Sequence, residues 1–191
     1  NRLLAQSGIY EAFTEKLAAK VRTLKVGNGA EAGVTQGPLI DSAALEKVEA
    51  QVADAVAKGG RILTGGQRHA CGGTFYEPTV IADATAQMRC AREETLGPVA
   101  PVFRFETEAE AIALANDTEF GLASYFFSQN LNRVIRVAEA LEYGMVGVNT
   151  GLISNEVAPF GGIKQSGFGR EGSKYGIEEY LVIKQMCIGL A

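Results

Sequence analysis

The hydrophobic residues near the start of the chain recur at the spacing of a helix. After a short strand predicted at residues 3–6, Ser7 is placed to cap a helix. The apolar face of this helix is expected to consist of Ile9, Phe13, Leu17, Val21 and Leu24. A second helix is predicted to follow Asp41 and to stop at Gly59-Gly60. Its apolar face is expected to consist of Leu45, Val48, Val52 and Val56.

Strand patterns then alternate with helix patterns. Short apolar runs predict strands at residues 61–64, 75–81, 102–105, 122–128 and 145–149. Thr107 with Glu110 forms a capping box for a helix that reaches Asn116, and Asn130 is placed to cap the next helix. The inner face of that second helix is predicted to be Val134, Val137 and Leu141. The strand over 122–128 is too apolar to be half exposed. This order of elements predicts parallel crossover units in an α/β fold, a three-layer α/β/α domain.

The last part of the chain predicts an element that needs a partner. A brief helix is expected after Ser173, followed by a strand over residues 180–188, which are rich in β-forming side chains. An apolar strand at a terminus pairs either with its own sheet or with that of another subunit.

Composition narrows the possible partners. The chain has 191 residues, of which 47% are hydrophobic, enough for one compact domain with a full core. A net charge of −4 gives no basic footprint of the kind that nucleic-acid binding requires, so no nucleic-acid partner is expected. No apolar run is long enough to cross a membrane, so no membrane partner is expected. The start lacks both an initiator Met and a signal-peptide layout, and the chain is expected to begin inside a longer protein.

The cysteine and histidine inventory excludes the usual metal sites. Cys71, Cys90 and Cys187 are odd in number and widely spaced, and His69 is the single histidine. No metal site is therefore predicted. The three cysteines are expected to be buried or incidental reduced thiols of a cytoplasmic protein, and His69 a solvated surface imidazole.

The stretch over residues 149–172, NTGLISNEVAPFGGIKQSGFGREG, mixes glycines with large and charged residues. It predicts an ordered loop that turns tightly while it holds particular side chains, with a flexible exposed loop as the alternative. It leaves the carboxyl end of a predicted strand, where ligands of parallel sheets gather. Residues 167–172 match GxGxxG, but no strand precedes them and no acid follows on a second strand. A dinucleotide-binding turn is therefore rejected here.

Other signatures of chemistry are few. The sequence contains no phosphate-binding GxxxxGK[ST], no HExxH and no GxSxG. Glu93 and Glu94 precede a Gly-Pro turn, which places an acid at a rigid corner where it could accept hydrogen bonds from ligand hydroxyls. A solvated acidic turn is the alternative for this segment alone.

Several motifs occur in a fixed order: EETLGP, VNTG, PFGGIKQSGFGRE and YGIEEY. Together they resemble the aldehyde dehydrogenase superfamily over essentially the whole chain. The resemblance is closest to its succinate-semialdehyde branch, particularly at GLISNEVAPFGGIKQSGFGREGSKYGIEEY and in VGNG followed by GPLID.

The resemblance implies a reaction and a place in a longer enzyme. Such enzymes attack an aldehyde with a cysteine thiolate, pass hydride to NADP+ or NAD+, and hydrolyse the thioester with a glutamate-activated water. By the family pattern the nucleophile, the base and the dinucleotide domain precede Asn1. No catalytic residue is therefore expected in this chain, which would be inactive alone. Residues 1–174 are expected to form the C-terminal catalytic domain and residues 175–191 an oligomerisation arm of a homodimer or homotetramer.

The resemblance also assigns supporting roles. Glu94 matches the acid that holds the nicotinamide ribose, and Leu96 a cofactor contact where the family usually has Phe. Phe160 matches an aromatic wall of the aldehyde channel. Ser154 matches a serine of the succinate-semialdehyde branch that helps to bind the distal carboxylate of the substrate. Lys164 and Arg170 are expected to be structural.

Three functions stay open on this basis. The first is oxidation of succinate semialdehyde to succinate, and the second is oxidation of another aldehyde, such as glutarate semialdehyde or a neutral aliphatic one, with Ser154 as the discriminating feature. The third is a truncated, non-catalytic chain that serves assembly.

Overall fold

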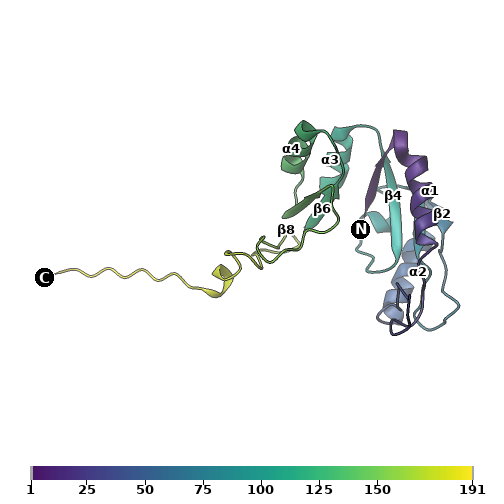
Figure 1. Cartoon of the computed structure of the whole chain (residues 1–191), viewed down its shortest axis with the longest axis horizontal. Helices are drawn as coiled ribbons and strands as arrows, with labels where there is room; N and C mark the ends of the chain where they lie inside the picture. The colour runs from purple at the N-terminus through teal and green to yellow at the C-terminus, as the bar shows by residue number, and fades with distance from the viewer. Residues whose placement is uncertain (1, 191) are drawn as a thin grey trace. The chain divides into compact units, whose positions relative to one another are not determined.

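The structure is a computed structural model that describes residues 2–190 (Figure 1). The chain divides into two compact units, Asn1–Ala111 and Ile112–Ala191. Asn1 and Ala191, which the predicted domain bounds include, lie outside the described residues. The predicted boundary after residue 174 falls within the second unit, and it stays a prediction.

The first unit is built on a four-stranded sheet in the order β1-β4-β3-β2. Strands β1, β3 and β4 are parallel, and β2 runs antiparallel to β3. The elements are β1 (Leu3–Gln6), a 3-10 turn η1 (Ser7–Ile9), α1 (Tyr10–Val21), α2 (Ser42–Ala57), β2 (Arg61–Thr64), β3 (Thr79–Ala84), η2 (Arg89–Ala91) and β4 (Val99–Phe105).

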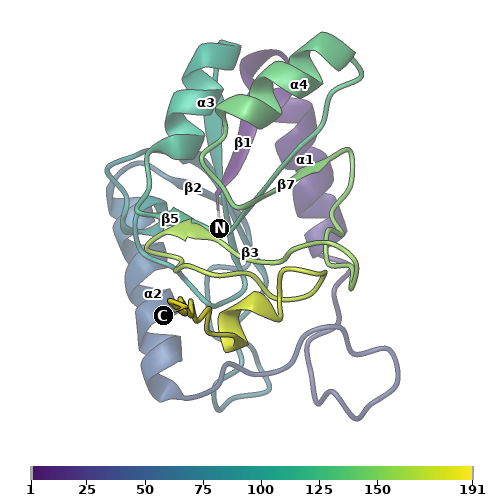
Figure 2. The ribbon, with the colours of Figure 1, turned by 90° about the vertical axis from the view of Figure 1, so that its left-hand side faces the viewer.

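Alternate residues of the central strands serve two separate cores. Val80 and Val102 pack with Tyr10 of α1, whereas Ile81 and Phe103 pack with α2. Because successive strand side chains point to opposite faces, α1 and α2 cover opposite faces of the sheet. Figure 2 shows the two helices on either side of the strands. The predicted three-layer α/β/α arrangement is confirmed in this unit.

Tyr10 ties α1 to strands β3 and β4 of the sheet. Its ring is fully buried, and its hydroxyl donates to the Val102 carbonyl at 3.0 Å and accepts from the Asp83 amide at 2.6 Å. Asp83 has a φ of 59° where the pairing of β3 with β4 shifts register. Burial is the main cause that raises the pKa of the Tyr10 hydroxyl, which therefore stays protonated.

Both predicted helices occur where they were expected, but one cap and some of the buried positions differ from the prediction. Asp41 caps α2 by accepting from the Ala44 amide at 2.8 Å, as expected. Ser7 does not cap α1, because a 3-10 turn comes first and its hydroxyl bonds to Glu106 instead. The most buried positions of α1 are Tyr10, Thr14 and Ala18, with Phe13, Leu17 and Val21 packed beside them and Ile9 and Leu24 exposed. In α2, Ala55 takes the buried place expected for Val56.

One predicted strand is displaced. The strand expected over residues 75–81 is β3 at Thr79–Ala84, because residues 75–77 instead close the Gly-rich turn that precedes it. In that turn the His69 amide donates to Phe75 and the Glu77 amide donates to Gln67. The backbone groups of residues 75–77 are thus used for hydrogen bonds within the turn and are not available to pair in the sheet.

The second unit contains the predicted crossover. Its elements include most of α3 (Glu108–Asn116), then β5 (Phe120–Gly121), β6 (Ala123–Phe126), α4 (Leu131–Ala140), β7 (Met145–Val148), β8 (Ile163–Lys164) and η3 (Glu178–Tyr180). Strands β6 and β7 are parallel, as predicted, and β5 pairs antiparallel with β8. The caps of both helices are confirmed: the amide of Glu110 donates to Thr107, and that of Arg133 to Asn130.

Burial in this unit is lower than the sequence predicts. The strand expected to be fully buried, β6, leaves Tyr125 exposed, and Phe127 just after it is 74% exposed. Among the expected inner positions of α4, only Val137 is buried. The sheet of β6 and β7 has just these two strands, so it offers little surface to cover apolar side chains.

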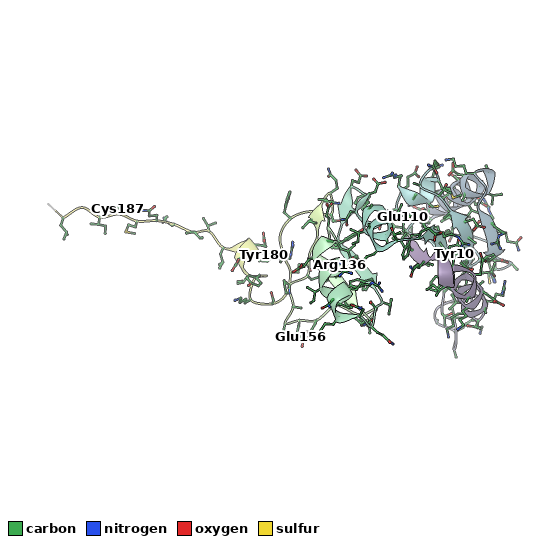
Figure 3. All side chains as sticks on the ribbon, turned by 90° about the horizontal axis from the view of Figure 1, so that it is seen from above. Tyr10, Glu110, Arg136, Glu156, Tyr180 and Cys187 are labelled. Carbon is green, nitrogen blue, oxygen red and sulfur yellow. The ribbon has the colours of Figure 1, made fainter. Side chains whose placement is uncertain are left out.

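The strand predicted over residues 180–188 does not form in the structure. After η3, residues 181–190 carry no secondary structure and are exposed. Figure 3 labels Cys187 on this extended segment and Tyr180 just before it. An extended chain becomes a strand only when its amides and carbonyls find partners, and none pairs with it within residues 2–190. Pairing with another subunit stays a prediction.

Candidate functional site

The Glu93–Pro98 turn is held in place by helix α2. Thr95 is 3% exposed, and its hydroxyl donates to Oε1 of the fully buried Gln51 at 2.7 Å. Arg89 binds both carboxylate oxygens of Glu93 at 2.9 Å, and this hydrogen bonding is the main cause that lowers the pKa of Glu93. The Arg89 amide donates in turn to Asp54 of α2 at 2.8 Å. The turn is therefore ordered.

Glu94 and Leu96 flank the buried Thr95 and are both exposed. Glu94 makes no hydrogen bond or ion pair with any of residues 2–190, so both of its carboxylate oxygens are available to a ligand. Leu96 is 72% exposed and has a φ of 47°. This left-handed backbone conformation is energetically unfavourable for any residue that has a Cβ atom. Glu94 can therefore accept hydrogen bonds from a ligand, and the exposed Leu96 side chain offers an apolar contact two residues away.

The Gly-rich loop of the second unit is ordered by charged side chains on backbone carbonyls. One guanidinium nitrogen of Arg170 donates to the carbonyls of Gly162 and Gly169, at 2.8 and 2.7 Å. Lys164 Nζ donates to the carbonyls of Asn116 and Thr118 and pairs with Glu142. The predicted ordered loop is confirmed, and both charged residues have the structural contacts that were expected of them.

The segment that carries Ser154 is fixed at both ends. At its start, Asn149 has a φ of 55° and exchanges two side-chain hydrogen bonds with the backbone of Ser128, at 2.9 and 2.8 Å. At its end, Phe160 pairs with Glu171 through two backbone hydrogen bonds of 2.9 and 2.7 Å.

Ser154 itself is exposed and has no hydrogen-bond partner among the described residues. Its neighbour Ile153 packs against Gly147 of β7, where an added Cβ would lie 2.9 Å from the Ile153 side chain. The Ser154 hydroxyl is thus a free donor next to an anchored residue. Phe160 is 36% exposed, so part of its ring is available for contact.

The sequence profile of the aldehyde dehydrogenase family matches residues 1–186. The chain belongs to this family. It is 65% identical over 189 residues to the glutarate-semialdehyde dehydrogenase of Pseudomonas aeruginosa and 64% identical over 189 residues to the 3-sulfolactaldehyde dehydrogenase of Pseudomonas putida. Each match covers 99% of this chain and 39% of the relative.

The fold agrees with that of solved aldehyde dehydrogenases. The crystal structure of succinate-semialdehyde dehydrogenase from Burkholderia pseudomallei superimposes with a TM-score of 0.96 at 61% identity, over 99% of this chain and 39% of that one. The chain thus spans about two fifths of the length of the relatives it matches.

The four predicted site residues of this aldehyde dehydrogenase chain fall on two loops. Glu94 and Leu96 lie on the turn before β4 in the first unit, and Ser154 and Phe160 lie on the loop between β7 and β8 in the second. The cofactor-contact and substrate-contact roles of these residues stay predictions.

The structure adds two residues that the sequence did not single out. Gln51 anchors the Glu94 turn and Asn149 anchors the Ser154 loop. Asn149 had a local signal, because an Asn at the end of a strand tolerates a left-handed backbone. Gln51 had a weaker one, since it is a polar residue on the buried side of an apolar helix.

His69 is partly exposed at the surface, and its solvation stays a prediction. Its Nδ1 accepts from the Cys71 amide at 3.2 Å, and it lines a cavity of about 210 Å³ in the first unit with Arg22 and Glu77. Cys90 is buried, as expected, but Cys71 and Cys187 are exposed. Residues 2–190 contain no cluster of three or more His, Cys, Asp or Glu side chains arranged to hold a metal ion. Over the same range no helix has the length and apolar character to cross a membrane.

Cys90 is expected to alkylate more slowly than Cys71 in the folded protein. Burial raises the pKa of the Cys90 thiol, so at neutral pH it has less of the reactive thiolate as well as less access to reagent. Peptide mass spectrometry after timed iodoacetamide treatment would measure both rates. In guanidinium the two rates should become equal, and equal rates in the folded protein would contradict this assignment.

Proposed function

We propose that the protein containing this chain oxidises an aldehyde with a distal anionic group to the corresponding acid, with NADP+ or NAD+ as the hydride acceptor. Succinate semialdehyde is the first candidate substrate. The observation that carries the proposal is the Ser154 hydroxyl, which is exposed, unpaired within the described chain and next to Ile153, which packs against Gly147. A small hydrogen-bond donor at this position leaves room for an anion and binds it.

The relatives support an anionic substrate class. Succinate semialdehyde and glutarate semialdehyde each carry a carboxylate distal to the aldehyde, and 3-sulfolactaldehyde carries a sulfonate. These three substrates differ in chain length and in the type of acid group, but all of them carry an anion distal to the aldehyde. Glutarate semialdehyde is the second candidate, because the relative with that name is 65% identical to this chain.

Glu94 and Leu96 fit a nicotinamide dinucleotide. The free Glu94 carboxylate would accept hydrogen bonds from the hydroxyls of the ribose, and the exposed Leu96 side chain would lie against an apolar part of the cofactor. When bound, the dinucleotide supplies the hydride acceptor. Phe160 would form an apolar wall beside the aldehyde chain.

The nucleophilic cysteine is proposed to lie on a segment that precedes Asn1. Among the described cysteines, Cys90 is buried with a raised pKa, and Cys71 and Cys187 are exposed. The Nδ1 of His69 accepts from the Cys71 amide and not from its thiol. Assembly as a homodimer or homotetramer through the segment after residue 174, and a cytoplasmic location, belong to the same proposal.

Aldehyde-dependent reduction of NADP+ and NAD+ tests this function. Succinate semialdehyde, glutarate semialdehyde and butanal would be compared on the protein with its complete natural reading frame and on the 191-residue chain. The expected result is activity in the complete protein alone, with a semialdehyde preferred over butanal. Equal use of butanal would overturn the anionic substrate class. Activity of the short chain would overturn the position of the nucleophile, and inactivity of both proteins would favour the non-catalytic alternative.

A further inference from the structure

Helix α2 runs along the segment that leads to Glu94 and contacts it with one face. The face consists of Val48, Gln51 and Asp54, which are three residues apart and therefore lie on the same side of the helix. Lys58, the C-cap residue just after the helix, extends this contact. Asp54 accepts from the amide of Arg89, and Lys58 donates to the carbonyl of Gln87 at 2.7 Å. The polar residues of this face thus bind the backbone of the segment directly.

Gln51 makes the central and most buried of these contacts. Both Gln51 and Thr95 are removed from water, and the Thr95 hydroxyl donates to Gln51 Oε1 at 2.7 Å. The Gln51 Nε2 also donates to the Glu93 carbonyl at 3.5 Å, so the side chain binds the turn on both sides of Glu94. One turn earlier on the helix, Val48 packs against Gly97 so closely that an added Cβ there would lie 2.5 Å from it. The turn is therefore held at Thr95 and at Gly97.

This anchoring determines where Glu94 and Leu96 project. Neighbours of a buried residue in extended or turning chain point away from it, and here both neighbours of Thr95 are exposed. The left-handed conformation of Leu96 persists only because the residues on either side of it are fixed. Without the Gln51 bond, the turn would lose the contact that keeps Thr95 inward.

We infer that Gln51 is a positioning residue for cofactor binding, acting through Thr95 on Glu94 and Leu96. The inference rests on the proposed function, in which Glu94 and Leu96 contact the dinucleotide. Gln51 itself does not touch the cofactor. Loss of the Gln51 side chain should weaken the binding of the dinucleotide, while the binding of aldehyde to the cofactor-loaded enzyme stays the same.

The test uses the complete protein and the dissociation constant of whichever dinucleotide it reduces, measured by isothermal titration calorimetry. Gln51→Met keeps the volume and removes both the acceptor for Thr95 and the donor to the Glu93 carbonyl, and Thr95→Val removes only the hydroxyl donor. Each is expected to raise the dissociation constant about 10-fold, because a buried polar group is left unpaired and the turn relaxes. The KM for aldehyde at saturating cofactor should not change. Thr95→Ser retains the hydroxyl and should keep the affinity of the parent protein.

A matched control separates positioning from general loss of stability. Val52→Ala removes buried side-chain volume from the same helix without touching the hydrogen bond to Thr95. If Gln51→Met weakens cofactor binding no more than Val52→Ala does, the inference is overturned.

Glu94→Gln separates this inference from the proposed role of Glu94. If Glu94→Gln weakens cofactor binding and Gln51→Met does not, the inferred positioning role of Gln51 is wrong, while the proposed role of Glu94 stands. If Gln51→Met weakens cofactor binding and Glu94→Gln does not, Gln51 acts through Leu96, and the proposed contact between Glu94 and the ribose is wrong. When both act through one contact, the double variant should bind no more weakly than Glu94→Gln alone.

Discussion

Gly144→Ala is expected to destabilise the protein by about 3 kcal/mol, because a Cβ at this position would overlap the carbonyl oxygen of Gly161. The neighbouring atoms at risk are all backbone, and the Gly144 amide is already tied to the Gly121 carbonyl at 2.9 Å. Neither side can move without breaking the contact between the start of β7 and the Gly-rich loop. A melting temperature several degrees lower, measured at one scan rate, is the expected readout.

Gly151→Ala is the matched control for this experiment. Gly151 lies in the same unit, a Cβ added to it would meet no atom within 4 Å, and its backbone does not require a positive φ. Its substitution should therefore leave the melting temperature within about one degree of the parent protein. Equal behaviour of the two variants would show that the loop is not packed on β7 as the structure has it.

Ser154→Ala is expected to lower kcat/KM for succinate semialdehyde about 10-fold or more, while kcat/KM for butanal stays the same. A hydrogen bond to a charged group contributes about 1.5–3 kcal/mol, and the hydroxyl is free to make one. Butanal has no distal anion, so it loses nothing. Steady-state rates with the two aldehydes on the complete protein measure the change.

Ser154→Thr provides the control, because it keeps the hydroxyl at the same position. This variant should retain the preference for the semialdehyde. A loss of activity toward both aldehydes in Ser154→Ala would instead indicate a change in the shape of the loop. That outcome would contradict a contact between Ser154 and the distal anion.

Features that depend on neighbours along the chain could be predicted from the sequence. The caps at Asp41, Thr107 and Asn130 each bond to an amide three residues ahead, so the short motif alone specifies the contact. The same holds for the pattern of strand, helix and strand that gives parallel β6 and β7. The order of the motifs was also sufficient to indicate the family without knowledge of the fold.

Features that depend on distant partners needed the tertiary structure. Tyr10 bonds to Asp83 of β3 across 73 positions of the sequence, a contact that no local pattern predicts. The expected burial of β6 was wrong, because burial depends on how many neighbouring elements cover a strand. The strand predicted over residues 180–188 is absent, because a strand requires a partner that sequence pattern does not supply.

The candidate site divides in the same way. The sequence by itself determined which residues are candidates, since Glu94, Leu96, Ser154 and Phe160 all lie in recognisable motifs. Only the tertiary structure revealed how they are held, because Gln51 and Thr95 are 44 positions apart and Asn149 and Ser128 are 21 apart. A motif records side chains that are close in the sequence, whereas the bonds that orient them form between segments that meet only after folding.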